Sequence, residues 1–199
     1  MLNTLRRLWK HSGGTAAIEF ALVMPMMFAV MFGIYELGAF VRVNMKVANA
    51  ATSIADLVSQ QAAGATGGTS GTFGNFCTAG KLTMSPYATN STSGAGTFSA
   101  AIASVTNYTS TGATVDWESD ASCAVTASSL GSTAKTLATT PTNVIPTAGT
   151  PGDSVIVVKV TYQYGSAISY LFPALTTLTQ VAYARPRNNQ TITCTAPCS

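Results

Sequence analysis

Hydrophobic and polar positions divide the chain into an apolar N-terminal run and a longer, more polar part. Sixteen uncharged residues separate Glu19 from Glu36, and at about 1.5 Å of helical rise per residue these carboxylates would lie roughly 26 Å apart. That distance approaches the ~30 Å hydrocarbon core of a bilayer. Beyond the run, apolar residues recur at steps of three and four, as on one face of a helix: Val47, Ala48, Ala51, Ile54, Ala55 and Val58. The pattern predicts one helix over residues 15–63, which spans a membrane and then covers a sheet of the same chain with its apolar stripe.

Residues 64–72 consist entirely of glycine, alanine, serine and threonine. This composition predicts a linker that can neither hold a helix nor bury a core. Residues 73–199 alternate in places with the two-residue period of a β-strand. They are predicted to hold strands at 105–109, 115–117, 155–164 and 177–185, a second helix at 98–105, and a turn or short helix at 166–173. The expected fold class is α+β, with a small antiparallel sheet packed on the outer half of the long helix.

A short basic leader precedes the apolar run. It contains Arg6, Arg7 and Lys10, whereas Arg42 and Lys46 follow the run. Basic residues are in excess on the cytoplasmic side of membrane helices. This bias, helped by the free amino terminus, predicts a cytoplasmic N-terminus and a head in the periplasm or outside the cell.

Residues 14–38 resemble the TadE/TadG-like proteins, pilin-like partners of the Flp (tight-adherence, type IVb) pilus system. The matching positions are Gly14, Ala17, Glu19, Phe20, Ala21, Leu22, Pro25, Phe32, Gly33, Glu36 and Gly38. The resemblance implies that a prepilin peptidase cuts between Gly14 and Thr15, which removes the leader 1–14 and places Glu19 at the fifth mature position. The chain has no room for the large extra domain of the longer TadG-type members, so it resembles the TadE type more closely.

Cleavage after Gly14 would create an amine on Thr15, one helical turn from Glu19 and on the same face. In a bundle of such helices, the carboxylate could neutralise the amine of its own or a neighbouring chain, because a buried charge is tolerated only when it is paired. Alternatively, Glu19 is a solvated residue at the membrane interface. Pro25 lies inside the span and is expected to kink the helix or to free a backbone carbonyl.

Two other kinds of N-terminal segment compete with the processed pilin-like anchor. A secretory signal peptide could be cut at Ala48-Asn49-Ala50, but that site lies well behind the apolar run, whereas signal peptidase sites follow it closely. A plain single-pass anchor explains the length of the run. It does not explain Glu19 or the glycine pair at 13–14.

Composition indicates an extracytoplasmic head that is held together partly by disulfides. Charged residues make up 9% of the chain, against a usual ~25%, and the net charge of +3 includes no run of Lys or Arg. Nucleic acid is therefore not an expected partner. Four cysteines allow three pairings, which the sequence alone cannot separate. Disulfides are the default in an oxidising compartment, and we favour the pairing Cys77–Cys123 and Cys194–Cys198. A zinc site is disfavoured, since only one pair is close in sequence and no histidine is near.

No catalytic residue, cofactor or small-molecule substrate is expected. The only histidine is His11, in the leader, and no serine lies in a Gly-x-Ser-x-Gly elbow. Asp116, Glu118 and Asp120 alternate and could share one face of a strand, as in a calcium site, but the loop glycine and the closing glutamate of such a site are absent. We expect a solvated acidic edge. Sequons begin at Asn90, Asn107 and Asn189, as chance produces in a chain rich in Ser and Thr.

These observations predict a minor pilin-like assembly protein of the bacterial inner membrane rather than an enzyme. Its expected partners are a prepilin peptidase, other pilin-like proteins, the inner-membrane assembly platform and membrane lipid. Incorporation into a surface pilus is left open. The alternative is a permanently anchored surface adhesin or binding protein, whose head binds an external ligand.

Overall fold

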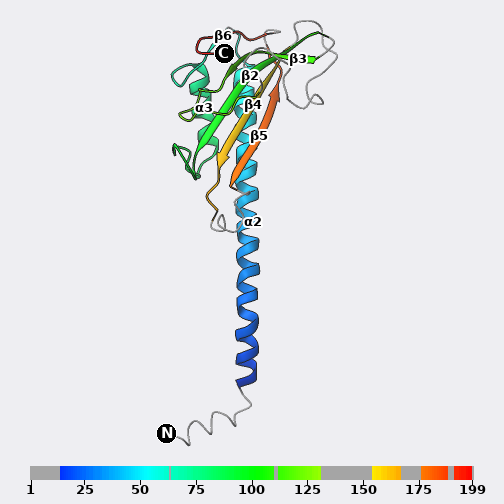
Figure 1. The fold of residues 1–199 in the computed structure, drawn as a ribbon, viewed down its shortest axis with the longest axis vertical. Coiled ribbons are helices and arrows are strands. Elements are labelled where there is room, and N and C mark those ends of the chain that lie inside the picture. The colour runs from blue at the N-terminus through cyan, green and yellow to red at the C-terminus, as the bar shows by residue number, and fades with distance from the viewer. Residues whose placement is uncertain are drawn as a thin grey trace, which may run out of the picture. The chain divides into compact units, whose positions relative to one another are not determined.

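The computed structural model describes residues 14–62, 64–109, 112–130, 154–166, 176–187 and 191–198. Its helices are α2 (Thr15–Ser59) and α3 (Thr72–Thr83), and its strands are β1 (Ala65–Thr66), β2 (Phe98–Thr109), β3 (Gly112–Ser119), β4 (Ser154–Gln163), β5 (Thr177–Ala184) and β6 (Cys194–Thr195) (Figure 1). The chain divides into two units, residues 1–39 and 40–199, and α2 contributes to both. Residues 1–13 of the predicted leader, nearly all of the predicted turn or helix at 166–173, and Asn189 lie outside the described residues.

The predicted long helix is confirmed by α2, and its apolar stripe lies on one face of the second half. The residues of this face recur at helical spacing and are all buried: Val43, Val47, Ala50, Ala51, Ile54, Ala55 and Val58. Ala48, which we expected in the stripe, lies at its margin and is only partly buried. A side chain of this kind stabilises a fold by roughly 1.5–3 kcal/mol when it is removed from water, so this half of α2 is part of the core of residues 40–199.

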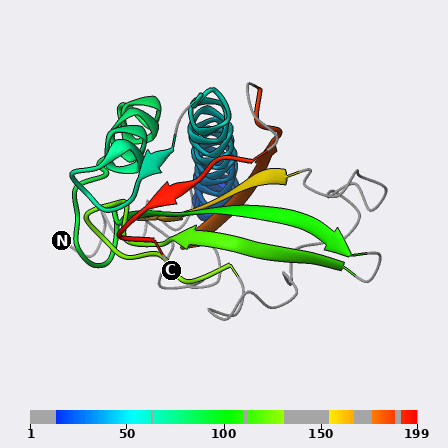
Figure 2. The same cartoon turned by 90° about the horizontal axis from the view of Figure 1, so that it is seen from above.

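A four-stranded antiparallel sheet, in the order β3-β2-β4-β5, forms the other side of this core. The expected antiparallel sheet is thereby confirmed. The ladder between β2 and β4 is unbroken from Phe98 opposite Tyr162 to Thr106 opposite Ser154. Figure 2 shows α3 and the outer part of α2 on the same face of this sheet. The side chains of that face pack against both helices; they include Phe98, Ala100, Ile102, Ile156, Val158, Val160, Tyr162, Leu178 and Ala182.

The predicted helix at 98–105 is wrong, because these residues begin the central strand β2. Phe98, Ile102 and Val105 are spaced as on a helix face, which explains the error. In the structure, alternate residues face opposite sides of the sheet, and residues 98–106 are buried on both sides. A strand that is covered on both faces shows no alternation between polar and apolar residues.

The second face of the sheet has a smaller core of its own. Ala103, Val105, Val115, Val155 and Val157 form this cluster, and Leu130 and Tyr183 pack against it. The segment after β3 is held there by Glu118, whose carboxylate accepts hydrogen bonds from the Leu130 N–H at 2.6 Å and the Ser129 hydroxyl at 2.7 Å. The head is therefore layered: helices, sheet and a covering loop.

The segment predicted to be a solvated linker is packed instead. Ala65 is fully buried, and β1 pairs in parallel with β6 at the other end of the head sequence. The Thr66 hydroxyl accepts the N–H of Thr72 at 2.8 Å, which satisfies one of the unpaired donors at the start of α3. A Cβ on Gly74 would overlap the backbone oxygen of Thr69. Glycine here thus permits close packing between the turn and α3, a helix that the sequence analysis did not predict.

Candidate functional site

The candidate processing site lies at the exposed beginning of α2. The helix starts at Thr15, directly after Gly14, and residues 14–20 are all exposed. Because residues four apart share a helix face, Glu19 lies one turn above Thr15 on the same side. The scissile bond inferred from the sequence is therefore at a helix end, where a protease needs to unwind little backbone.

The helix surface that follows is apolar around its whole circumference. In α2, residues 15–35 are all exposed in the structure, and the exposed large side chains include Ile18, Phe20, Leu22, Met26, Met27, Phe32 and Ile34. Soluble proteins rarely expose an apolar surface of this extent. Among the described residues, α2 is the one helix that is long and apolar enough to cross a membrane. These observations indicate a single-pass membrane protein.

Four further residues of the predicted membrane segment differ in their surroundings. The helix continues through Pro25, although proline cannot donate the hydrogen bond to the carbonyl four residues earlier. A Cβ added to Gly33 or Gly38 would meet no atom within 4 Å, so another helix could approach the backbone closely at both positions. Glu36 is buried, with 6% of its surface exposed, whereas Glu19 at the other end of the run is exposed.

The acidic residues of β3 do not form a shared site. The register between β2 and β3 shifts between Ser104 and Val105, which leaves Asp116 as an extra residue. A bulge of this kind changes which face a side chain occupies. Asp116 accepts a hydrogen bond from the Thr106 hydroxyl, whereas Glu118 binds the loop on the opposite face. The expectation of a solvated acidic edge is wrong for Glu118, which is only 5% exposed, and within the described residues no group of three His, Cys, Asp or Glu side chains could hold a metal ion.

The structure joins Cys77 to Cys123 and Cys194 to Cys198, the pairing favoured from the sequence. Cys77 and Cys123 are 2% and 3% exposed and tie α3 to the segment after β3. Cys194 and Cys198 are only partly buried, and Thr195, Ala196 and Pro197 between them are exposed. One disulfide is thus internal to the core, and the other closes a short loop at the surface.

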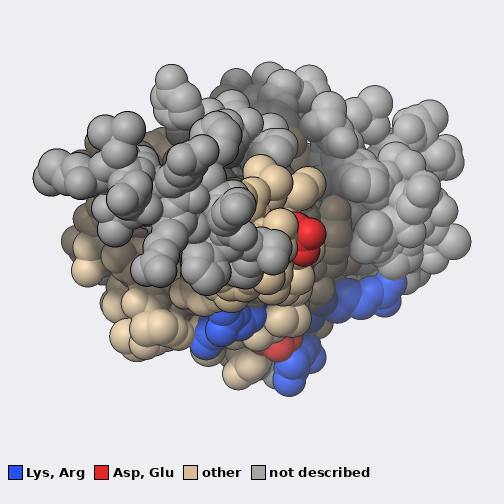
Figure 3. Space-filling model, turned by 90° about the horizontal axis from the view of Figure 1, so that it is seen from below, with Lys and Arg blue, Asp and Glu red and all other residues tan. Residues whose placement is uncertain are grey.

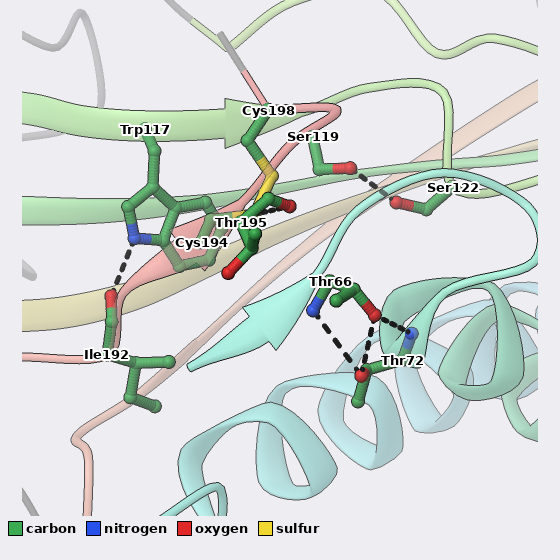
Figure 4. The surroundings of a disulfide bond; sticks show 9 residues. All are labelled: Thr66, Thr72, Trp117, Ser119, Ser122, Ile192, Cys194, Thr195 and Cys198. Atoms are coloured by element: carbon green, nitrogen blue, oxygen red, sulfur yellow. Dashed lines mark hydrogen bonds between the residues drawn. A yellow bond between two sulfur atoms is a disulfide. The ribbon is translucent and has the colours of Figure 1, made fainter. Parts of the chain in front are cut away.

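A C-terminal segment, residues 191–198, contains this short loop and is hydrogen-bonded to the rest of the head (Figure 4). The Trp117 indole N–H donates to the Ile192 carbonyl at 2.6 Å. The Ala65 N–H donates to the Thr193 carbonyl at 2.9 Å, and the Gly67 N–H to the Thr195 carbonyl at 3.2 Å. Trp117 also stacks on Phe73 of α3, with ring centroids 5.2 Å apart. None of these contacts could be read from the sequence, because each joins positions far apart in the chain, and the three hydrogen bonds join positions more than seventy residues apart.

Charged groups contribute little to the described surface of the head. Figure 3 shows only a few charged side chains among the uncharged ones of the described surface on one face of the molecule. Arg187 pairs with Asp56 at 3.4 Å, with both side chains about 60% exposed, and exposed pairs typically contribute about 0–1 kcal/mol. Lys159 donates to the Ser128 hydroxyl at 3.2 Å. Contacts made by this surface would depend mainly on shape and on neutral hydrogen-bonding groups.

Comparison with known proteins gives one match. The family model described as TadE-like protein matches residues 14–56, which confirms the resemblance found in the sequence and extends it to the part of α2 that packs on the sheet. No curated protein and no solved structure matches the chain.

Proposed function

We propose that this chain, which carries a TadE-like segment over residues 14–56, is a minor pilin-like assembly protein of a tight-adherence (Flp) type IV pilus. A TadE-like segment indicates a pilin-like protein that associates with other components of such a pilus. The finer proposal is that a prepilin peptidase cuts the Gly14–Thr15 bond and that the protein then acts by helix packing. The observation that carries it is the helix that begins immediately after Gly14. Its residues 15–35 are exposed and mostly apolar, and the carboxylate of Glu19 lies one helical turn after Thr15.

The apolar half of α2 supports packing among membrane helices. Association of helices in lipid depends on close approach and on satisfied polar groups, and small residues at an interface permit that approach. Gly33 and Gly38 leave open space beside the helix. Glu19 would stabilise packing against a neighbour that carries a positive charge, because an unpaired carboxylate at the edge of the membrane is energetically costly. The new amine of Thr15, on the same or an adjacent chain, supplies that charge.

The head is proposed to act through protein contacts rather than catalysis. Three of its described acidic groups make contacts within the fold: Glu118 holds a loop, Asp116 accepts from Thr106, and Asp56 pairs with Arg187. The proposed location is the bacterial inner membrane, with the N-terminus in the cytoplasm and the head in the periplasm. The proposed partners are the peptidase, other pilin-like proteins and the inner-membrane assembly platform.

N-terminal sequencing of the protein purified from membranes tests processing. The mature chain is expected to begin at Thr15, and Gly14→Val is expected to leave a larger, uncleaved form, because the branched side chain stands beside the scissile carbonyl and obstructs attack on it. Gly33→Val, with open space around its Cβ, is the matched control and should be cleaved normally. A wild-type chain that begins at Met1 would contradict processing, and one that begins at Ala51 would indicate a signal peptide.

Reporter fusions test the orientation. A reporter that is active only in the periplasm should be active when fused after Ser199, and one that is active only in the cytoplasm should be inactive there. The opposite result would refute the orientation inferred from Arg6, Arg7 and Lys10.

A deletion strain separates an assembly protein from an anchored adhesin, when its pili are recovered by shearing of the cells and its surface attachment is measured. Loss of pili on deletion supports assembly, whereas normal pili with lost surface attachment supports the adhesin.

A further inference from the structure

The two disulfides of the head differ in access, in loop size and in what they hold. Cys77 and Cys123 are nearly inaccessible, and 46 positions separate them in the sequence. Cys194 and Cys198 are four positions apart and partly exposed, with three exposed residues between them. A thiolate must reach a sulfur atom before it can exchange with a disulfide. Access therefore favours reaction at Cys194–Cys198.

Loop size acts in the same direction. A disulfide restricts the unfolded chain more when it closes a longer loop. The 46-residue separation makes Cys77–Cys123 the stronger constraint on the unfolded head. Cys77 and Cys123 are buried members of the core, whereas Cys194 and Cys198 only pack against that core and are partly buried. Opening Cys194–Cys198 removes a weak constraint and leaves the strong one intact, so the head remains folded.

The short disulfide nevertheless determines where the C-terminal segment lies. β6 pairs with β1 over two residues only, and a two-residue strand is too short to persist without further support. Its support comes from the closed loop, which lies against the turn after β1: a Cβ on Gly67 would overlap the Pro197 carbonyl oxygen and would lie 2.9 Å from the Cys198 sulfur. Once the loop opens, the hydrogen bonds from Ala65, Gly67 and Trp117 to this segment lose the support of the closed loop. They keep only the support of each other and of the buried Ile192 side chain.

We propose that Cys194–Cys198 is a redox-labile latch, which a dithiol reductant of the disulfide-oxidoreductase class opens while Cys77–Cys123 stays closed. One thiolate of the reductant attacks a sulfur of the pair and forms a mixed disulfide, and the other cysteine leaves as a thiolate and takes up a proton. The second thiol of the reductant then closes its own disulfide and releases the remaining cysteine as a thiol. Two electrons pass from the reductant to the latch. The released segment uncovers β1 and the indole N–H of Trp117, so the head has a closed and an open surface.

The experiment is stepwise reduction of the full chain in nanodiscs with dithiothreitol, followed by alkylation, mass mapping and amide hydrogen exchange. At low reductant, alkylation is expected at Cys194 and Cys198 only. Exchange of the Ala65 and Gly67 amides, which donate to the segment, should increase about tenfold or more, while amides of β2 and β4 stay protected. Reoxidation should restore the original exchange. In a Trp9→Phe background, Trp117 fluorescence should shift with the same reductant dependence.

Cys194→Ser/Cys198→Ser is the companion variant. It should show the rapid exchange at Ala65 and Gly67 without reductant and should not respond to reductant. The latch is refuted if both disulfides reduce together, if neither reduces before the head unfolds, or if Cys194–Cys198 reduces without a change at Ala65 and Gly67. None of these readouts depends on pilus assembly or on cleavage after Gly14, so the proposed function and the latch can fail independently.

Discussion

Replacing both Cys77 and Cys123 with alanine is expected to lower the free energy of unfolding of the head by about 4 kcal/mol, from the entropy of closing a loop of 46 residues. The two cysteines connect α3 to the segment after β3 and lie inside the core, 2% and 3% exposed. Alanine is preferable to serine here, because two buried hydroxyl groups without partners would add a cost of their own. The loss of packing around the sulfur atoms adds to the entropic figure rather than subtracting from it.

The matched comparison is Cys194→Ala/Cys198→Ala. The same expression gives about 2 kcal/mol for a loop of four residues, and the partly exposed site adds little packing loss. At roughly 2–4 °C per kcal/mol for a unit of this size, the core pair should lower Tm by about 8–16 °C and the surface pair by about 4–8 °C. Thermal unfolding followed by near-ultraviolet circular dichroism, with the full chain in detergent micelles, measures both. Equal shifts, or a larger shift for the surface pair, would refute the assignment of Cys77–Cys123 as the main covalent constraint.

Three further substitutions test other parts of the molecule. Glu19→Gln removes the charge but keeps a hydrogen-bonding group, so crosslinking to pilin-like partners should decrease while membrane insertion is retained; unchanged crosslinking of a correctly cleaved variant would refute charge pairing. Gly74→Ala should destabilise the head by about 1–3 kcal/mol in chemical unfolding, because its Cβ overlaps the Thr69 backbone oxygen, whereas Gly33→Ala in open space should leave the head unchanged. Burial raises the pKa of Tyr183 above its usual value, so the unfolded state ionises first and the head loses stability as pH rises past about 10; Tyr183→Phe should reduce that loss, and an identical alkaline titration would contradict it.

Elements with a strong period could be predicted from the sequence. The charge-free run and the stripe behind it gave α2 within a few residues, and the alternation at 155–164 gave β4, found at Ser154–Gln163. β5 was predicted at 177–185 and is found at Thr177–Ala184. In the second half of α2, in the second half of β4 and in β5, one face is more buried than the other, and that difference appears in the order of polar and apolar residues.

Elements whose surroundings are the same on both sides could not be predicted in this way. β2 is buried on both faces and contains mostly alanine, serine and valine, so its composition and spacing favoured a helix. The local helix signals of α3 are weak. Four of its first seven residues are β-branched or aromatic, and the whole helix contains two glycines. It forms because Gly74 lets the helix pack closely on the preceding turn. The bulge at Asp116 likewise depends on the partner strand, which the sequence of β3 alone does not describe.

The two halves of α2 explain why one helix can serve two purposes. Up to residue 35 the helix is apolar on all sides and exposed on all sides. This half is therefore stable only in apolar surroundings around its full circumference, which lipid or other apolar helices provide. From Val43 onward one face is buried against the sheet while Asn49, Thr52 and Asp56 on the other face are exposed to water. A substitution in the first half therefore changes which neighbours the helix accepts, and a substitution in the second half changes whether the head folds. Because α2 is continuous from Thr15 to Ser59, one helix provides both the apolar segment and a part of the core of the head.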